Sequence, residues 1–167
     1  MVIRSITFST NSTNIKKGKK EILIKDFFQI ANRLLMESNV SIRTNRLNLN
    51  PFSIESQYEG KNILGIVKWL SIFTTENNVR WLAAPFYTFN KNIKEVNKVA
   101  LEIVKRYENV FVNYILAENN KINREGIYYS SKLIKSLSKL SNNGFENFRF
   151  GTLFNCKPNA PYFPYTY

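Results

Sequence analysis

The chain has 167 residues, which is enough for one domain with a hydrophobic core, and its 44% hydrophobic content argues against a disordered protein. It carries 24 basic and 12 acidic residues, and the resulting charge of +12 would suit a phosphate, nucleic-acid or acidic-lipid partner. Codon bias toward Lys, Asn and Ile would produce the same basic surface, so charge alone assigns no partner. There is no histidine, the commonest general base and metal ligand, and the single cysteine excludes an internal disulfide.

Strand-like and helix-like hydrophobic patterns alternate along the chain. Strands are predicted at residues 2–8, 39–49, 78–86, 109–118 and 147–154. Helices are predicted at residues 21–38, 54–75, 92–107 and 123–141. The order βαβαβαβαβ predicts a single α/β domain over residues 1–167, with a mainly parallel five-stranded sheet and flanking helices.

Several local details are predicted within these elements. The first helix should bury the apolar stripe Leu23, Phe27, Ile30, Ala31 and Leu34. Ser53, Asn92 and Asn123 are the expected N-caps of the second, third and fourth helices, and Gly144 the expected left-handed C-cap of the fourth. The alternation of the second strand slips between Thr44 and Leu47, which predicts a bulge or an early end.

Two segments could carry chemistry but favour plain structural interpretations. The loop from Asn14 to Lys20 could hold a phosphate before a helix, yet it lacks the glycine-lysine-Ser/Thr pattern of a phosphate loop. Cys156 could be a nucleophile, but without a histidine partner a small buried side chain is the favoured interpretation. No clustered ligands suggest a metal, and no catalytic residues or cofactor are predicted.

Arginines on or beside the strands are the strongest candidates for a binding site, because an unpaired buried guanidinium is costly. They are Arg4, Arg43, Arg46, Arg80 and Arg149. Of these, Arg43, Arg46 and Arg149, with Asn147, could converge at one end of the sheet and clamp a carboxylate or phosphate. The alternative is that the arginines pair with Glu118, Glu146 or backbone carbonyls. In parallel sheets ligands usually bind outside the carboxyl ends of the strands, which is where such a site is expected.

The C-terminal stretch, residues 147–167, is rich in aromatics and proline. In its last part, residues 156–167, the prolines forbid a helix, so the aromatics there need a surface, and packing against protein is favoured over stacking on single-stranded nucleic acid. The stretch resembles the signature of domain of unknown function 711, also called uncharacterised protein family 0210. The matching positions are Asn147, Phe148, Arg149, Phe150, Asn155, Pro158, Pro161, Phe163, Pro164 and Tyr167.

The opening "IRSIT" and the second-strand "IRTNRLNLNPF" are also similar to that family, so the resemblance runs from end to end. Members of the family are usually longer, which implies that this chain corresponds to their N-terminal part and is a truncated or split form. The family resembles the PFL-like glycyl radical enzyme barrel, in which two five-stranded parallel halves face each other. The resemblance therefore implies half of a barrel-like fold, and it brings no established activity.

The sequence leads to one functional expectation and two alternatives. We expect a protein without catalysis of its own that at most weakly binds a small anionic metabolite near Arg43, Arg46, Asn147 and Arg149. One alternative is a small basic nucleic-acid-binding protein. The other is a subunit that completes a barrel by self-association or with a partner supplying the missing half. The chain has no apolar run long enough for a membrane span and no secretory pattern, so the cytoplasm is the expected location.

Overall fold

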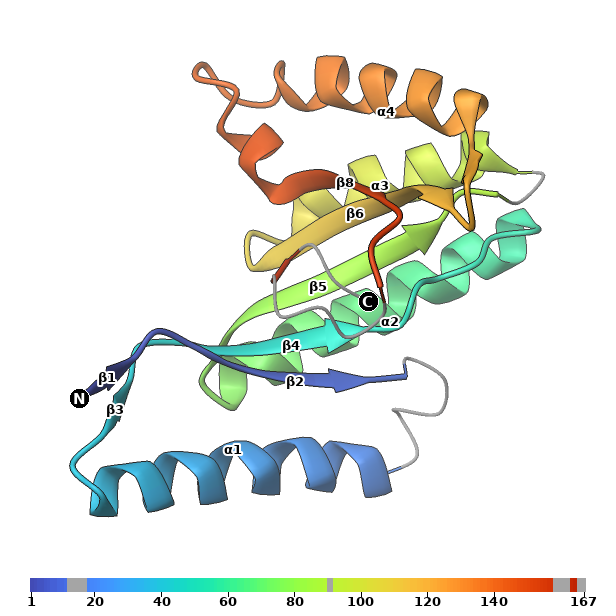
Figure 1. The fold of residues 1–167 in the computed structure, drawn as a ribbon. Coiled ribbons are helices and arrows are strands. Elements are labelled where there is room, and N and C mark those ends of the chain that lie inside the picture. The colour runs from blue at the N-terminus through green and yellow to red at the C-terminus, as the bar shows by residue number, and fades with distance from the viewer. Residues whose placement is uncertain (12–17, 90–91, 158–162, 165–167) are drawn as a thin grey trace.

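The computed structural model describes residues 1–11, 18–89, 92–157 and 163–164. Its helices are α1 (Lys19–Glu37), α2 (Gln57–Glu76), α3 (Ile93–Arg106) and α4 (Arg124–Leu137), and a short 3-10 helix η1 spans Phe145–Arg149. The main parallel strands are β2 (Ile6–Thr10), β4 (Asn45–Leu49), β5 (Val79–Tyr87), β6 (Val110–Glu118) and β8 (Phe150–Phe154). Figure 1 shows their arrangement.

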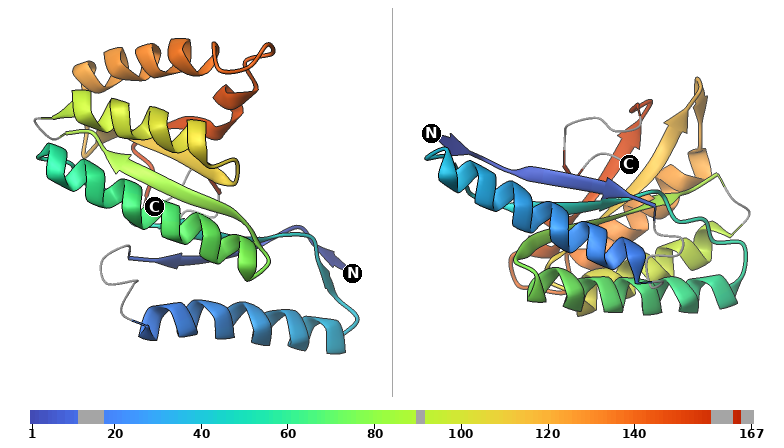
Figure 2. Two further views of the ribbon diagram at one scale, coloured as in Figure 1. Left: turned by 180° about the vertical axis from the view of Figure 1, so that it is seen from behind. Right: turned by 90° about the horizontal axis from the view of Figure 1, so that it is seen from below.

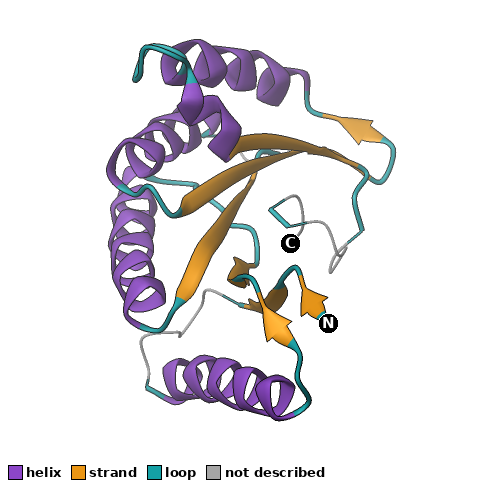
Figure 3. Ribbon diagram, turned by 90° about the vertical axis from the view of Figure 1, so that its left-hand side faces the viewer, coloured by secondary structure: helices purple, strands orange, loops and turns teal. Residues whose placement is uncertain are grey.

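Strands that follow one another in the sequence are neighbours in the sheet. The order is β2-β4-β5-β6-β8, so that β8 is the strand next to β6, and each neighbouring pair is parallel. Right-handed crossovers between successive parallel neighbours place their helices on one face of the sheet. Figures 2 and 3 show this arrangement: the helices form an arc outside a curved sheet, and the concave face looks the other way. The predicted α/β order and mainly parallel sheet are confirmed.

Three two-residue strands complete the structure. β1 (Val2–Ile3) pairs with β3 (Ser41–Ile42) in a separate parallel pair, and β7 (Lys121–Ile122) runs antiparallel to the end of β6. The predicted first and second strands are therefore each interrupted. In the second, the register between β4 and β5 shifts at Asn45 and Arg46. That irregularity lies within the predicted interval, so the expected bulge is confirmed.

The convex face of the sheet forms the hydrophobic core with α2 and α3. Leu47, Leu82 and Val112 belong to one buried cluster that also contains residues of both helices. In α3, Val96, Ala100 and Ile103 are buried. Because this helix lies over the middle of the sheet, its apolar face is covered along its whole length.

Helix α1 faces the sheet differently from the prediction. Its buried residues are Ile24 and Phe28, whereas Leu23, Ile30 and Leu34 remain 57%, 48% and 52% exposed. The apolar arc of α1 is wider than its contact with the sheet, because α1 lies beside the edge strand β2 and has no second helix beyond it (Figure 3). The predicted stripe was therefore wrong at three of its positions, Leu23, Ile30 and Leu34.

The helix ends confirm some predicted caps and correct others. Asn123 caps α4, since its side chain accepts a hydrogen bond from the Gly126 amide. The predicted cap Ser53 was wrong: the N-cap of α2 is Ser56, which forms a reciprocal capping box with Glu59. Asn92 stands at the N-cap of α3, but its side chain makes no capping hydrogen bond.

Gly144 adopts the predicted left-handed conformation, with φ of 61°, but in a different role. Helix α4 has already ended at Leu137, with Ser138 as its C-cap, and Gly144 begins η1 instead. The predicted fifth strand is correspondingly shortened, because residues 145–149 form η1 and only residues 150–154 join the sheet. No helix among the described residues combines the length and the apolar character that a membrane span requires.

Candidate functional site

The concave face of the sheet carries polar side chains in its middle. Leu47 and Leu49 of β4 point into the convex core, so Arg46 and Asn48 between them point to the concave side. The same alternation in β6 places Asn113 on the concave side, between the core residues Val112 and Tyr114. We call Arg46, Asn48 and Asn113 the concave polar cluster.

The cluster is unusual because its buried polar atoms lack partners. Asn48 is 0% exposed, and neither its amide nitrogen nor its amide oxygen has a hydrogen-bond partner in the structure. The same is true of Arg46 Nε and Asn113 Oδ1. An unsatisfied buried polar group costs about 1–3 kcal/mol, so such groups usually pair with protein, ordered water or a bound ligand.

The electrostatic surroundings of the cluster are positive. Burial lowers the pKa of Arg46, and the nearby positive charges of Arg4 and Arg80 lower it further. None of these three arginines forms an ion pair with a described residue. A guanidinium remains protonated at neutral pH even with a lowered pKa, so the concave face carries uncompensated positive charge.

Aromatic rings and a C-terminal segment lie over this charge. The Arg46 guanidinium carbon is 5.0 Å from the centroid of the Phe163 ring, and that ring packs edge-on against Phe111 at 5.7 Å. The Asn113 amide nitrogen donates a hydrogen bond to the Pro164 carbonyl. The prediction that aromatics of the C-terminal stretch pack against protein is confirmed for Phe163; residues 158–162 and 165–167 lie outside the described residues.

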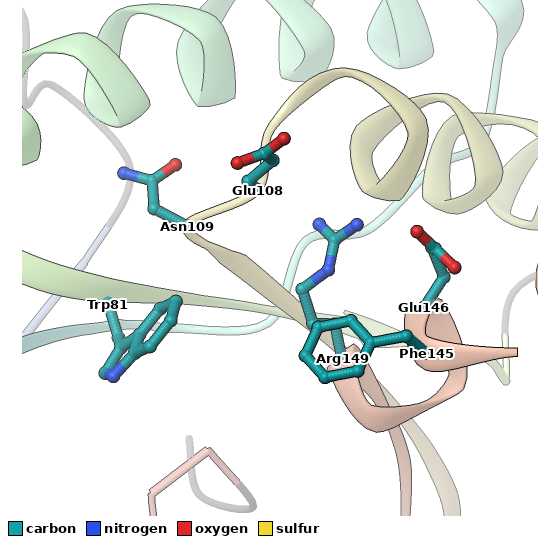
Figure 4. Close-up of a pocket in the computed structure, with 6 residues that line it drawn as sticks. All are labelled: Trp81, Glu108, Asn109, Phe145, Glu146 and Arg149. Carbon is teal, nitrogen blue, oxygen red and sulfur yellow. The ribbon is translucent and has the colours of Figure 1, made fainter. Parts of the chain in front are cut away.

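Apart from the concave polar cluster, the structure has a pocket where β5, β6 and η1 meet. It is a pocket of about 450 Å³, lined by Trp81, Glu108, Asn109, Phe145, Glu146 and Arg149 (Figure 4). In Figure 4 the guanidinium of Arg149 points toward α3. Its two terminal nitrogens donate to the carbonyls of Tyr107 and Val104, at 2.6 and 2.8 Å.

Arg149 therefore completes the carboxyl end of α3. Its side chain donates to the Val104 carbonyl, in the last turn of the helix, and is a second donor to the Tyr107 carbonyl, and its positive charge lies at the negative end of the helix dipole. Burial lowers the pKa of Arg149, while Glu146 and Glu108 oppose that shift. Among the two interpretations of the sequence, pairing with backbone carbonyls is the one that the geometry shows.

The comparison with protein families bears on the whole chain. The family described as "Uncharacterised ACR (DUF711)" matches residues 1–167. The chain belongs to this family. No curated protein matches it. DUF711 membership agrees with the resemblance seen in the sequence, but it assigns no reaction, so the site must be argued from its own geometry.

In this DUF711 member the four predicted site residues lie at different places. Arg46 belongs to the concave polar cluster, whereas Arg149 is buried against α3. Arg43 is exposed, and its backbone amide donates to Ile3. Asn147 lies in η1, where its side-chain oxygen has no partner. No hydrogen bond or ion pair joins Arg46 to the other three.

Asn48 and Asn113 were missed by the sequence interpretation. Each is a single asparagine within an apolar strand, in "LNL" and "FVNYIL". This pattern could have drawn attention, because an amide between core residues must bury its polar atoms. The expectation that a site lies outside the carboxyl ends of the strands differs from this geometry, since the cluster lies along the middle of the concave face.

The other two segments considered as functional sites in the sequence, Cys156 and the loop from Asn14 to Lys20, show no such unsatisfied polar groups among their described residues. The Cys156 thiol is half-buried and donates to the Phe154 carbonyl at 3.8 Å. In the loop from Asn14 to Lys20, residues 14–17 lie outside the described residues. Across the part of the chain that the structure describes, no group of three His, Cys, Asp or Glu residues could hold a metal ion.

Proposed function

We propose that the concave face binds a small anion through Arg46, Asn48 and Asn113. The observation that carries the proposal is Asn48, a wholly buried amide with no partner for either polar atom. A ligand bound on the concave face would supply partners for the Asn48 amide and remove the desolvation cost. The proposal concerns binding and assigns no reaction.

The charge of the face favours an anion. The charges of Arg4 and Arg80 act on Arg46, and none of the three arginines forms an ion pair with a described carboxylate. A guanidinium binds carboxylates and phosphates through paired hydrogen bonds, which gives both strength and orientation. The free oxygens of Asn48 and Asn113 accept hydrogen bonds, so a carboxylate or phosphate that also carries a hydroxyl group satisfies more of the cluster than a simple anion does.

The test is calorimetric titration of the full chain with inorganic phosphate, glycolate and acetate. Glycolate differs from acetate by one hydroxyl group and should bind more tightly. Arg46→Gln should weaken binding by about tenfold or more, because it removes a charge-assisted hydrogen bond. Arg43→Gln is the matched control, since Arg43 is exposed and lies three residues away on the same segment. Equal affinities for both variants and the unmodified chain would contradict the proposal.

We propose, as a second function, that the chain self-associates to complete a barrel. The observation that favours it is the exposed apolar stripe of Leu23, Ile30 and Leu34 on α1, at one edge of the sheet. Five parallel strands are too few to close a barrel of ordinary size, which needs about eight, so both edges of the curved sheet stay open. A second copy would supply five more strands and cover the stripe.

Size-exclusion chromatography with light scattering tests self-association. Ile30→Glu should shift the chain toward monomer, whereas Ile72→Glu should not. Ile72 is the matched control because it is equally exposed, at 49%, but lies on α2 away from the stripe. A chain that remains monomeric at high concentration would overturn self-association and favour a separate polypeptide, or a longer form of this chain, as the missing half.

We also propose a cytoplasmic location, which the low cysteine content supports. Nucleic-acid binding rests on the charge of +12 alone and is the weaker proposal. Titration of a labelled single-stranded oligonucleotide at rising salt would reveal it as an affinity that falls steeply with ionic strength.

A further inference from the structure

We infer that Phe163 and Pro164 cover the proposed anion site and must move before a ligand can enter. The inference rests on the proposed anion site and adds an obligatory opening step to it. Asn48 has two polar atoms available for bonding, yet it is 0% exposed, so no ligand from solvent can reach it in this conformation.

The two covering residues engage the other members of the cluster directly. The Phe163 ring lies over the Arg46 guanidinium at 5.0 Å, and the Pro164 carbonyl accepts the hydrogen bond from the Asn113 amide. These are the donors that an anion would use. The described part of the C-terminal segment and the ligand therefore compete for the same groups, and both cannot bind them at once.

Two contacts between described residues hold the cover on the cluster. A ring over a guanidinium and one amide-to-carbonyl hydrogen bond are both interactions that an anion can replace with stronger, charge-assisted ones. Phe163 also packs against Phe111, which belongs to the rigid sheet. Phe163 and Pro164 thus have a defined closed position, and an anion can compete for the groups that they contact.

Competition of this kind has a measurable consequence. The apparent dissociation constant of a ligand equals the intrinsic constant divided by the fraction of molecules that are open, so it rises as the closed state becomes more populated. Removing the Phe163 ring should therefore tighten phosphate binding. From the usual strength of a cation–π contact at a half-buried site, the expected gain is about twofold to tenfold.

The experiment compares phosphate affinities of full-length variants by calorimetry. Phe163→Ala should bind phosphate more tightly than the unmodified chain, and Phe154→Ala should bind it equally. Phe154 is the matched control because it is a half-exposed phenylalanine at the end of β8, with no recorded contact to Arg46. Unchanged or weaker phosphate binding by Phe163→Ala would overturn the inference that Phe163 covers the site. Phe163 would then either contact the bound anion or have no part in binding.

The same variants separate this inference from the proposed function. If Arg46→Gln leaves phosphate binding intact, the anion site itself is wrong. If Arg46→Gln abolishes binding but Phe163→Ala does not tighten it, only the cover is wrong.

A direct readout is available from fluorine NMR with 4-fluorophenylalanine at position 163. Saturating phosphate should move the signal toward that of a solvent-exposed ring, because the ring leaves the guanidinium and Phe111. A signal that stays unchanged while phosphate binds would overturn the inference.

Discussion

The two faces of the sheet are built from the same strands but differ in chemistry. On the convex side, Leu47, Leu82 and Val112 pack against helices in a continuous apolar core. On the concave side, their sequence neighbours include Arg46 and Asn113, with charge and amide atoms that the fold leaves unsatisfied. Adjacent residues of a strand point to opposite faces, so stability and binding are assigned to alternate positions of one segment. Single substitutions should therefore affect one property and spare the other.

The largest effect is expected on the convex side. Leu82→Ala, at a position with 0% exposure, should lower the free energy of unfolding by about 2–5 kcal/mol, because it removes buried apolar surface and leaves a cavity. Urea unfolding followed by circular dichroism measures it. Phosphate affinity of the remaining folded protein should be unchanged. A loss of stability no larger than that of the exposed control Ile72→Ala would break the distinction between the faces.

A smaller loss is expected from Arg149→Met. The side chain is 6% exposed, and its removal takes the Arg149 donor away from the Val104 carbonyl and one of two donors away from the Tyr107 carbonyl, at a cost of about 1–3 kcal/mol. Arg80→Met, at an exposed arginine, is the control and should change the unfolding free energy little. Phosphate binding should survive Arg149→Met; a folded variant that no longer binds phosphate would assign Arg149 to the anion site after all.

Asn48→Leu should change stability in the opposite direction. The substitution replaces an amide without partners by an apolar side chain of similar size, so the free energy of unfolding should stay constant or rise by about 1 kcal/mol. Phosphate binding should be lost. A clear destabilisation would show that the Asn48 amide is satisfied in the folded protein, and the argument for a ligand site would fail.

The smallest effect at neutral pH is expected at Tyr114. Burial raises the pKa of its hydroxyl well above the ordinary value of 10.0, and the hydroxyl donates to Asn97 at 3.3 Å. Below pH 10 the group is neutral in both states and its contribution is fully present. As the pH rises beyond 10, the unfolded tyrosine ionises first and stability is lost. Tyr114→Phe should lose less stability between pH 9 and 11 than the unmodified chain, measured by thermal unfolding.

The sequence predicts the fold well because its information is local. Apolar residues at helical spacing in α3, and the uninterrupted apolar run of β6, each specify one element without reference to the rest. The cap at Asn123 follows from its position before a helix in the same way. The buried face of helix α1 cannot be predicted locally in this way. Which half of its apolar arc becomes buried depends on the position of α1 at the edge of the sheet.

The candidate site is predicted less completely for a physical reason. Arg46 and Arg149 look alike in the sequence, each within a strand-like segment. Only the path of the chain decides that Arg149 meets the end of α3 while Arg46 meets the Phe163 ring. The free amide of Asn48 is harder still to foresee, because lacking a partner is a property of its neighbours and not of the residue.

The sequential strand order has a consequence for the nascent chain. Each parallel strand pairs with the main strand made just before it, so every βα unit can add to a surface that is already present during synthesis. Arg149 forms one of the long-range contacts of the fold, because it reaches back 45 residues to Val104. The ribosome must therefore deliver residue 149 before the carboxyl end of α3 is complete, and polypeptides released earlier should be more vulnerable to proteases at that end.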